Sequence, residues 1–356
     1  MTASRPTQLD HYRLLGRSGL RVSPLCLGTM TFGEGWGFGA TPEVCRQQVD
    51  AYAARGGNFI DTANNYTNGQ SETILGQILL GRRERFVLAT KYTLNTIATD
   101  PNAGGNHRKS MVRSLETSLK RLGTDHIDLF YVHIWEYRTP VAEVMRALDD
   151  LVRSGKVLYI GISDTAAWKI AQANTLAELR GWSPFIALQG EYSLIERDVE
   201  REWTPMAREL GLGLIPWGAL NGGVLTGKYN PIDAAHADDT RRNRGEGLDD
   251  RKRAISIAVQ EVARELGRSP AQVALNWLAA QPVVTSVLLG ARKAEQLLDT
   301  LDCLSFTLEP EHLARLEAVS RVPLGFPHGM LASPGVGQLI DGQAVVEWPQ
   351  RPHPAD

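Results

Sequence analysis

Residues 126–163, HIDLFYVHIWEYRTPVAEVMRALDDLVRSGKVLYIGIS, hold one complete strand–helix–strand unit. Its two ends, 126–133 and 156–163, are short apolar runs rich in β-branched and aromatic residues, which is typical of buried strands. Between them, apolar residues recur at the spacing of one helix face: Val141, Val144, Leu148, Leu151 and Val152. Because two strands joined through a helix usually pair in parallel, this unit predicts a parallel sheet.

The same alternation runs along most of the chain. The other β-rich runs are LCLGT (25–29), NFID (58–61), RFVLATK (85–91), FIALQ (185–189), LGLIPW (212–217) and VVTSVLLG (283–290). Eight such runs in 356 residues favour a closed (β/α)8 TIM barrel, although an open doubly wound sheet would give the same pattern. No G-x-G-x-x-G motif follows the first run, and this absence supports the barrel.

Other segments depart from this rhythm. Residues 12–25 carry two apolar stretches around a Gly/Ser turn and predict a β-hairpin that plugs one barrel end. Thr41 and Pro42 resemble an N-cap and first residue of a helix. The segments 228–253 and 321–356 are predicted to be long loops, either linkers or covers over the active face. We expect one domain over residues 1–356, with 321–356 as a C-terminal loop or lid.

Composition excludes several classes of protein. The chain has 38 basic and 40 acidic residues, so it lacks the net positive charge that would hold nucleic acid or an anionic membrane. Its three cysteines form no C-x-x-C pair, which argues against a disulfide framework or a zinc site. No signal-like or bilayer-spanning apolar run is present. We therefore expect a cytoplasmic protein without a metal, acting on a small neutral molecule.

Ionisable residues follow three of the predicted strands. Asp61, Lys91 and His133 end the second, third and fourth runs, and Tyr66 lies five residues after Asp61. Barrel enzymes build their sites at these strand ends. The set suits carbonyl reduction: Tyr66 would donate the proton, Lys91 would lower the pKa of Tyr66, Asp61 would hold Lys91, and His133 would orient the carbonyl. Each residue alone is better explained as a structural group, and only their combination indicates catalysis.

Seven ordered motifs then resemble the aldo-keto reductases over nearly the whole chain, closest to the aryl-alcohol-dehydrogenase-like and channel β-subunit-like branch. They are DTANNY, ATKY, FYVH, GISD, ALQGEYS, IPWGALNGGVLTGKY and LLGARKAEQL. The resemblance implies a (β/α)8 barrel, a catalytic tetrad of Asp61, Tyr66, Lys91 and His133, and reversible reduction of aldehydes and some ketones.

The resemblance also implies a site for NADPH. Ser163, Asp164 and Gln189 would contact the nicotinamide carboxamide, and Trp217 would stack on the ring. The pyrophosphate would lie along Gly218, Leu220, Gly222 and Lys228. The adenosine 2′-phosphate would lie at Gly290, Ala291, Arg292 and Gln296, where a guanidinium favours NADPH over NADH. Asp164 departs from the asparagine that many relatives carry, which puts its donor role in doubt.

Four aromatic residues near predicted loop ends are candidates for a substrate pocket: Trp36, Tyr92, Trp135 and Phe326. They suit an aromatic or medium-chain aldehyde, and each is equally explained as a core residue. Trp36 stands out because its glycine-rich loop, TFGEGWGFG, is a poor setting for core packing.

Two other functions remain open alongside the reductase. Similar barrels serve as redox-sensing regulatory subunits, although the roughly ten residues before Tyr12 are short for an inactivating arm. A barrel isomerase or aldolase would use Lys91 as a Schiff base and would leave the cofactor motifs unexplained. The oligomeric state is not readable from the outer helices, and a homo-oligomer is favoured only weakly.

Overall fold

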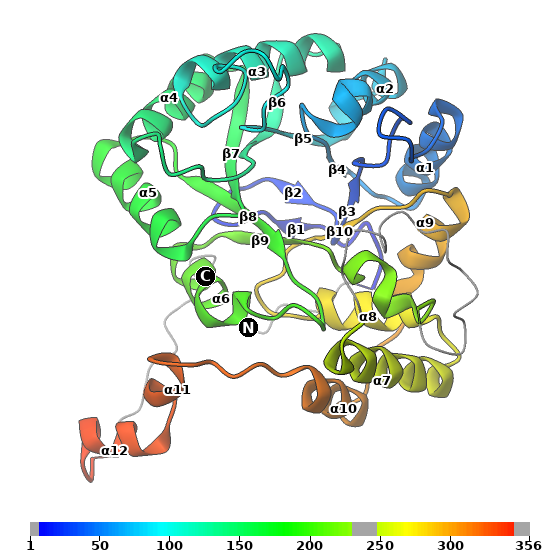
Figure 1. The fold of residues 1–356 in the computed structure, drawn as a ribbon, viewed down its shortest axis with the longest axis vertical. Helices are drawn as coiled ribbons and strands as arrows, with labels where there is room; N and C mark the ends of the chain where they lie inside the picture. The colour runs from blue at the N-terminus through cyan, green and yellow to red at the C-terminus, as the bar shows by residue number, and fades with distance from the viewer. Residues whose placement is uncertain (1–6, 230–247, 345–356) are drawn as a thin grey trace.

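The computed structural model describes residues 7–229 and 248–344, and an eight-stranded parallel sheet forms its centre. The strands are β3 Leu25–Gly28, β4 Phe59–Asp61, β5 Val87–Tyr92, β6 Ile127–Val132, β7 Val157–Ser163, β8 Phe185–Glu191, β9 Gly213–Trp217 and β10 Val287–Leu289. Their order is β10-β3-β4-β5-β6-β7-β8-β9 (Figure 1). At the seam, Leu214 bridges to Val284, and the Thr285 N–H donates to the Leu214 carbonyl at 2.9 Å. The predicted barrel is confirmed, and the open sheet is excluded.

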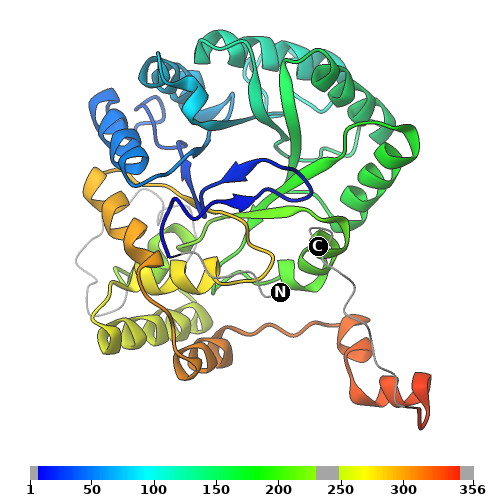
Figure 2. The same ribbon diagram turned by 180° about the vertical axis from the view of Figure 1, so that it is seen from behind.

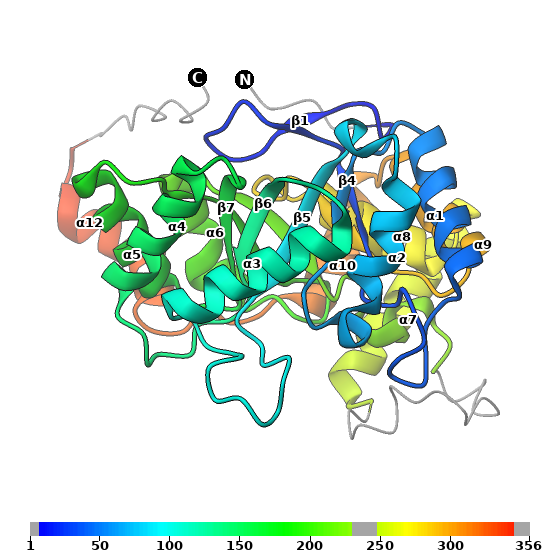
Figure 3. The same ribbon diagram turned by 90° about the horizontal axis from the view of Figure 1, so that it is seen from above.

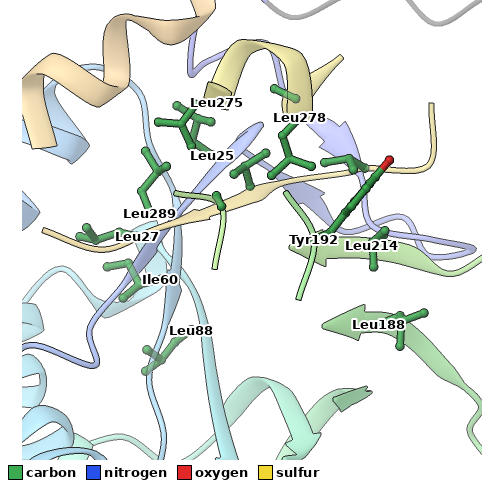
Figure 4. Close-up of a cluster of buried hydrophobic side chains, with 14 of the residues drawn as sticks. Leu25, Leu27, Ile60, Leu88, Leu188, Tyr192, Leu214, Leu275, Leu278 and Leu289 are labelled. Atoms are coloured by element: carbon green, nitrogen blue, oxygen red, sulfur yellow. The ribbon is translucent and has the colours of Figure 1, made fainter. Parts of the chain in front are cut away.

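The alternation of side chains along each strand produces two apolar layers. One cluster fills the barrel interior and includes Cys26, Phe59, Ala89, Leu129, Tyr131 and Ile215. The other lies between the strands and the surrounding helices, and Figure 4 shows part of it. Because both faces of the strands are buried, these strands are almost continuously apolar in sequence. A polar residue that points into the barrel therefore requires a partner there.

Eight helices surround the strands within the described residues. They are α1 Pro42–Ala54, α2 Gln70–Leu79, α3 Arg108–Leu122, α4 Val141–Arg153, α5 Ala167–Arg180, α6 Val199–Leu210, α8 Pro270–Ala279 and α9 Ala294–Leu301. Pro42 begins α1 as predicted, but the Thr41 side chain makes no capping hydrogen bond. The expected buried face of α3 is confirmed at Met111, Leu115, Leu119 and Leu122.

Two further helices lie outside this ring, α7 Asp250–Leu266 and α10 Pro310–Ser320. They pack against each other beside α8 (Figure 1). Short 3-10 turns complete the described structure: η1 Tyr66–Gly69, η2 Arg83–Arg85, η3 Asn221–Thr226 and η6 Asp302–Leu304. No helix among the described residues is long and apolar enough to cross a membrane.

The N-terminal hairpin, β1 Arg13–Leu14 and β2 Arg21–Val22, crosses one end of the barrel (Figure 2). Leu15 and Val22 are fully buried in the interior cluster, so the predicted plug is confirmed. Gly16 has φ +54°, and a Cβ atom there would meet the Ile186 carbonyl oxygen at 2.2 Å. Only glycine fits this close approach. The loops that follow the strands extend from the opposite end (Figure 3).

The C-terminal segment contains two short helices, α11 His328–Leu331 and α12 Pro334–Asp341, in a stretch predicted to be a loop. Pro334 at the first helical position favours the start of α12. The segment contacts α6: the Arg201 guanidinium donates to the Pro323 carbonyl at 3.1 Å, and His328 pairs with Glu202 at 2.8 Å. A role as a lid stays a prediction. Residues 230–247 of the other predicted loop, and 345–356, lie outside the described residues.

Candidate active site

The fold brings the four ionisable residues predicted from the sequence to one end of the barrel. Asp61 is the last residue of β4, Lys91 lies near the end of β5, and His133 follows β6 directly. Tyr66 begins η1, the turn between β4 and α2. Neighbouring parallel strands end at the same rim, so these side chains converge although the chain separates them widely.

Asp61, Lys91 and Tyr66 form a connected polar group. The Lys91 ammonium forms a short ion pair with Asp61, donates to the Thr62 carbonyl at 2.9 Å, and lies 3.1 Å from the Tyr66 hydroxyl. Lys91 is fully buried and Asp61 nearly so. Gln189 of β8 donates its amide N–H to the second Asp61 oxygen at 2.9 Å. A buried charge is tolerated only when it is paired and hydrogen-bonded, and both charges here satisfy that condition.

Burial and neighbouring charges set the ionisation of this group. Burial lowers the pKa of Lys91, but the Asp61 carboxylate and the Tyr66 hydroxyl raise it by more, so the ammonium stays charged. Burial raises the pKa of Tyr66, and the Lys91 charge lowers it only in part. The net pKa of Tyr66 in the protein alone therefore stays above its reference value, although Lys91 lowers it as predicted. The charge acts in the expected direction, but the loss of solvation acts more strongly.

His133 lies beside Tyr66, with ring centroids 5.9 Å apart in an edge-to-face arrangement. Burial, followed by the positive charge of Lys91, lowers the pKa of His133 to about 3. The imidazole is therefore neutral at physiological pH, with one N–H to donate and one nitrogen to accept. Its Nδ1 atom is buried without a hydrogen-bond partner. A neutral His133 is suited to donate a hydrogen bond to a carbonyl oxygen, but not to act as a second source of the proton.

The loop that carries Tyr66 is held by a second buried ion pair. Arg121 of α3 donates to the Asn64 carbonyl at 2.8 Å and pairs with the fully buried Glu72 at 3.1 Å. Glu72 also accepts from the Thr90 hydroxyl at 2.7 Å. Glu72 was not identified from the sequence, because a single Glu on a helix gives no signal of burial. These contacts fix the backbone two residues before Tyr66.

Comparison with known proteins identifies the family of the chain. The model of the aldo/keto reductase family matches residues 24–321. That match covers most of the chain, including every strand of the barrel. The chain belongs to the aldo/keto reductase family.

Individual relatives of this aldo-keto reductase are similar over nearly their full length. A norsolorinic acid reductase of Aspergillus flavus is 38% identical over 92% of this chain and 85% of its own. An aryl-alcohol dehydrogenase of Pestalotiopsis microspora is 39% identical over 94% and 88%. An aldo-keto reductase of Aspergillus calidoustus is 37% identical over 96% and 90%. The chain is thus an NAD(P)-dependent oxidoreductase that acts on small-molecule carbonyl or CH–OH groups.

Residues at the ends of β7, β8 and β9 fit a nicotinamide group in this reductase. The Ser163 hydroxyl is buried and makes no hydrogen bond, so it remains able to bind a carboxamide. Gln189 uses its N–H on Asp61, which leaves its amide oxygen as an acceptor. Trp217 is partly exposed, and its indole N–H donates to Asp164 at 3.0 Å. At the same rim, a buried hydroxyl without a partner would suit the carboxamide of nicotinamide, and a flat aromatic side chain would suit its ring.

The two segments predicted to hold the rest of the dinucleotide follow β9 and β10. Gly218 and Gly222 adopt left-handed φ values of +69° and +62° in the turn that contains Leu220 and leads to Lys228. After β10, Gly290 is exposed, and the Ala291 carbonyl accepts from the Thr31 hydroxyl at 2.9 Å. The exposed Arg292 donates its backbone N–H to the Gln296 side chain at 3.2 Å. Both segments lie at the rim where the tetrad converges.

The four aromatic candidates for the substrate pocket are placed very differently. Trp36 packs edge-on against Tyr66, with ring centroids 6.3 Å apart. Trp135 is buried in the loop after His133, with the Lys169 ammonium 5.6 Å from its ring. Tyr92 is fully buried and stacks on Phe130 in the layer between strands and helices. Phe326 is 84% exposed. Of the four rings, that of Trp36 packs against the ring of a tetrad residue, Tyr66.

Proposed function

We propose that this chain is an NADPH-dependent reductase of aldehydes, aromatic or medium-chain, and of some ketones, and that Tyr66 donates the proton. The single observation that carries the proposal is the 3.1 Å contact between the Tyr66 hydroxyl and the buried Lys91 ammonium. As a carbonyl is reduced, negative charge develops on its oxygen, and a positioned acid must neutralise it. NADPH, when bound, supplies the hydride.

The roles of the four residues follow from their contacts. Tyr66 gives its proton to the carbonyl oxygen, and the Lys91 ammonium stabilises the phenolate that remains. Asp61 keeps Lys91 charged and oriented through their ion pair. His133, neutral because of its lowered pKa, donates a hydrogen bond to the same oxygen. In the reverse direction the Tyr66 phenolate accepts the proton of the alcohol.

The charge on Lys91 argues against a Schiff-base mechanism. A lysine nucleophile needs a free lone pair, and enzymes provide it by lowering the pKa of the amine. Here the balance of burial and the Asp61 carboxylate raises the pKa of Lys91. The ammonium is also occupied by hydrogen bonds to Thr62 and Tyr66.

Aromatic substrates are favoured by Trp36, whose ring lies against Tyr66. The names of the relatives, aryl-alcohol dehydrogenase and norsolorinic acid reductase, point in the same direction. The preference for NADPH rests on Arg292, whose guanidinium suits a phosphate group.

The function is tested by following loss of the reduced nicotinamide absorbance with a panel of aromatic and aliphatic aldehydes, using NADPH and NADH in parallel. We expect turnover with NADPH and faster reduction of aromatic aldehydes. Absence of turnover with every aldehyde, despite binding of NADPH, would contradict the proposal.

A further inference from the structure

Asp164 occupies a strained and tightly held position at the rim of the barrel. It follows Ser163, the last residue of β7, with φ +38°. Non-glycine residues rarely adopt this region, and such outliers gather at functional sites. Its backbone N–H donates to the Gln189 carbonyl at 3.3 Å, and its Oδ1 atom accepts from Trp217 Nε1 at 3.0 Å. Asp164 thereby links the ends of β7, β8 and β9.

The carboxylate lies at the same rim as the tetrad, one residue beyond β7. The side chain of Asp164 is exposed to solvent. Loss of solvation raises its pKa, and the Trp217 hydrogen bond and the Lys91 charge offset this only in part. After burial and the charges of Lys91 and Asp61, Asp164 also affects the pKa of Tyr66. The geometry gives the connection: the Gln189 carbonyl accepts from the Asp164 N–H, and the Gln189 amide donates to Asp61, so one residue joins Asp164 to the Asp61–Lys91–Tyr66 group.

Carbonyl reduction requires the hydride donor at the same place. Tyr66 protonates the carbonyl oxygen, so the donor ring must approach the adjoining carbon to within about 3–3.5 Å. Trp217 offers a partly exposed flat surface at this rim, and Asp164 is hydrogen-bonded to it. A nicotinamide ring that reaches the substrate would therefore lie beside the Asp164 carboxylate.

We propose that Asp164 is a counter-charge for the oxidised nicotinamide ring, and that it shifts the binding preference of this chain towards NADP+. The inference rests on the proposed function. The oxidised ring carries a positive charge and the reduced ring is neutral, so a nearby carboxylate stabilises only the oxidised form. A neutral residue at position 164 would not distinguish the two forms in this way.

The preference has a consequence for the direction of reaction. A group that stabilises bound NADP+ more than bound NADPH shifts the equilibrium between the enzyme-bound species towards the complexes that contain NADP+. With NADP(H) bound, the complex of NADP+ with the alcohol would thus be favoured over the complex of NADPH with the carbonyl, and NADP+ would dissociate more slowly. Asp164 is thus a positioning and specificity-determining residue, because it acts on the cofactor's charge and orients Trp217.

The test is the substitution Asp164→Asn, which removes the charge but keeps an oxygen that accepts from Trp217. Wild type and variant are titrated separately with NADP+ and NADPH, without substrate, and binding is followed by tryptophan fluorescence. We expect the ratio of NADP+ affinity to NADPH affinity to fall about tenfold in the variant, because NADP+ binds more weakly. This is the size expected for the loss of one charge near a partly hydrated ring.

Asp125→Asn is the matched control, because it also removes one carboxylate. Asp125 precedes β6 at the opposite end of the barrel from His133, and its side chain is 96% exposed. We expect its NADP+ to NADPH ratio to equal that of wild type. An unchanged ratio in Asp164→Asn, or an equal change in Asp125→Asn, overturns the inference while the proposed function stands. If wild type binds neither nucleotide, the proposed function itself is overturned.

Discussion

The Nζ atom of Lys91 lies 3.1 Å from the hydroxyl oxygen of Tyr66, although 25 positions separate the two residues in the chain. The same ammonium forms a short ion pair with Asp61. One fully buried positive charge thus connects a carboxylate to a phenol. Because the three groups are coupled, removing any one of them changes the ionisation of the others.

Removal of one partner of the Asp61–Lys91 ion pair should destabilise the protein as well as abolish catalysis. In Asp61→Ala, Lys91 is left buried and uncompensated, and we expect a loss of about 3–5 kcal/mol in the free energy of unfolding. The double variant Asp61→Asn/Lys91→Met carries no buried charge and should recover most of that stability, but no activity. Urea denaturation followed by circular dichroism measures this. Equal stability of the single variant and wild type would contradict the account.

The pH dependence of stability should report His133. Its pKa is about 3 in the folded protein, below the unperturbed value of about 6.5, so the unfolded chain binds the proton more readily. Stability should therefore decrease as the pH falls from about 6.5 towards 3, by at most about 1.4 kcal/mol per pH unit from this residue, and be unaffected above 6.5. We expect His133→Gln to flatten this part of the curve. The same slope in variant and wild type would show that other groups cause it.

The Arg121–Glu72 ion pair should position the loop that carries Tyr66. In Arg121→Met the fully buried Glu72 carboxylate loses its charge partner, and we expect destabilisation by about 3–5 kcal/mol. Because the Asn64 carbonyl also loses its donor, kcat should fall more than KM changes. The double variant Arg121→Met/Glu72→Gln should regain stability while kcat stays low.

Arg113→Ala is the control for that experiment. Arg113 lies on the same helix and pairs with Asp100, but both side chains are partly exposed, at 42% and 32%. Such surface pairs contribute about 0–1 kcal/mol, so stability and kcat should stay close to wild type. If Arg113→Ala had the same effect as Arg121→Met, the burial of Glu72 would not be the cause.

Arg292 should determine the preference between the two dinucleotides. We expect Arg292→Ala to weaken NADPH binding about 10- to 100-fold, the usual size for a lost hydrogen bond between charged groups, and to leave NADH binding nearly unchanged. Arg180→Ala, at the end of α5 on the opposite side of the barrel, is the control. Titration of each variant with both dinucleotides measures the effect. Equal weakening of NADPH and NADH would assign Arg292 another role.

Much of the fold follows from the sequence because its strands are buried on both faces. Each of the eight apolar runs contains a strand of the barrel. The residues at the ends of these strands lie at one rim, as parallel topology requires. The mutual contacts of Asp61, Tyr66 and Lys91 were predictable for the same reason. The placement of α7 and α10 outside the ring was not, since an amphipathic helix does not specify which neighbour it packs on.

Side-chain direction and solvation explain the remaining differences. Lys91 points into the barrel, so the next residue, Tyr92, points to the helices; strict alternation along β5 would have removed Tyr92 from the substrate candidates. Phe326 is exposed because its segment contacts α6 on the outside of the barrel. Only the tertiary structure shows this placement. The raised pKa of Tyr66 depends on burial, which cannot be inferred from the identity of the neighbouring charged residues.

The most direct test of the central claim is the comparison of wild type with Tyr66→Phe in NADPH oxidation with an aromatic aldehyde, together with NADPH binding to both proteins. Loss of the proton donor should lower kcat about 100- to 10,000-fold, while the affinity for NADPH stays within a factor of about two. A Tyr66→Phe variant that turns over at the wild-type rate would contradict the assignment of Tyr66 as the proton donor.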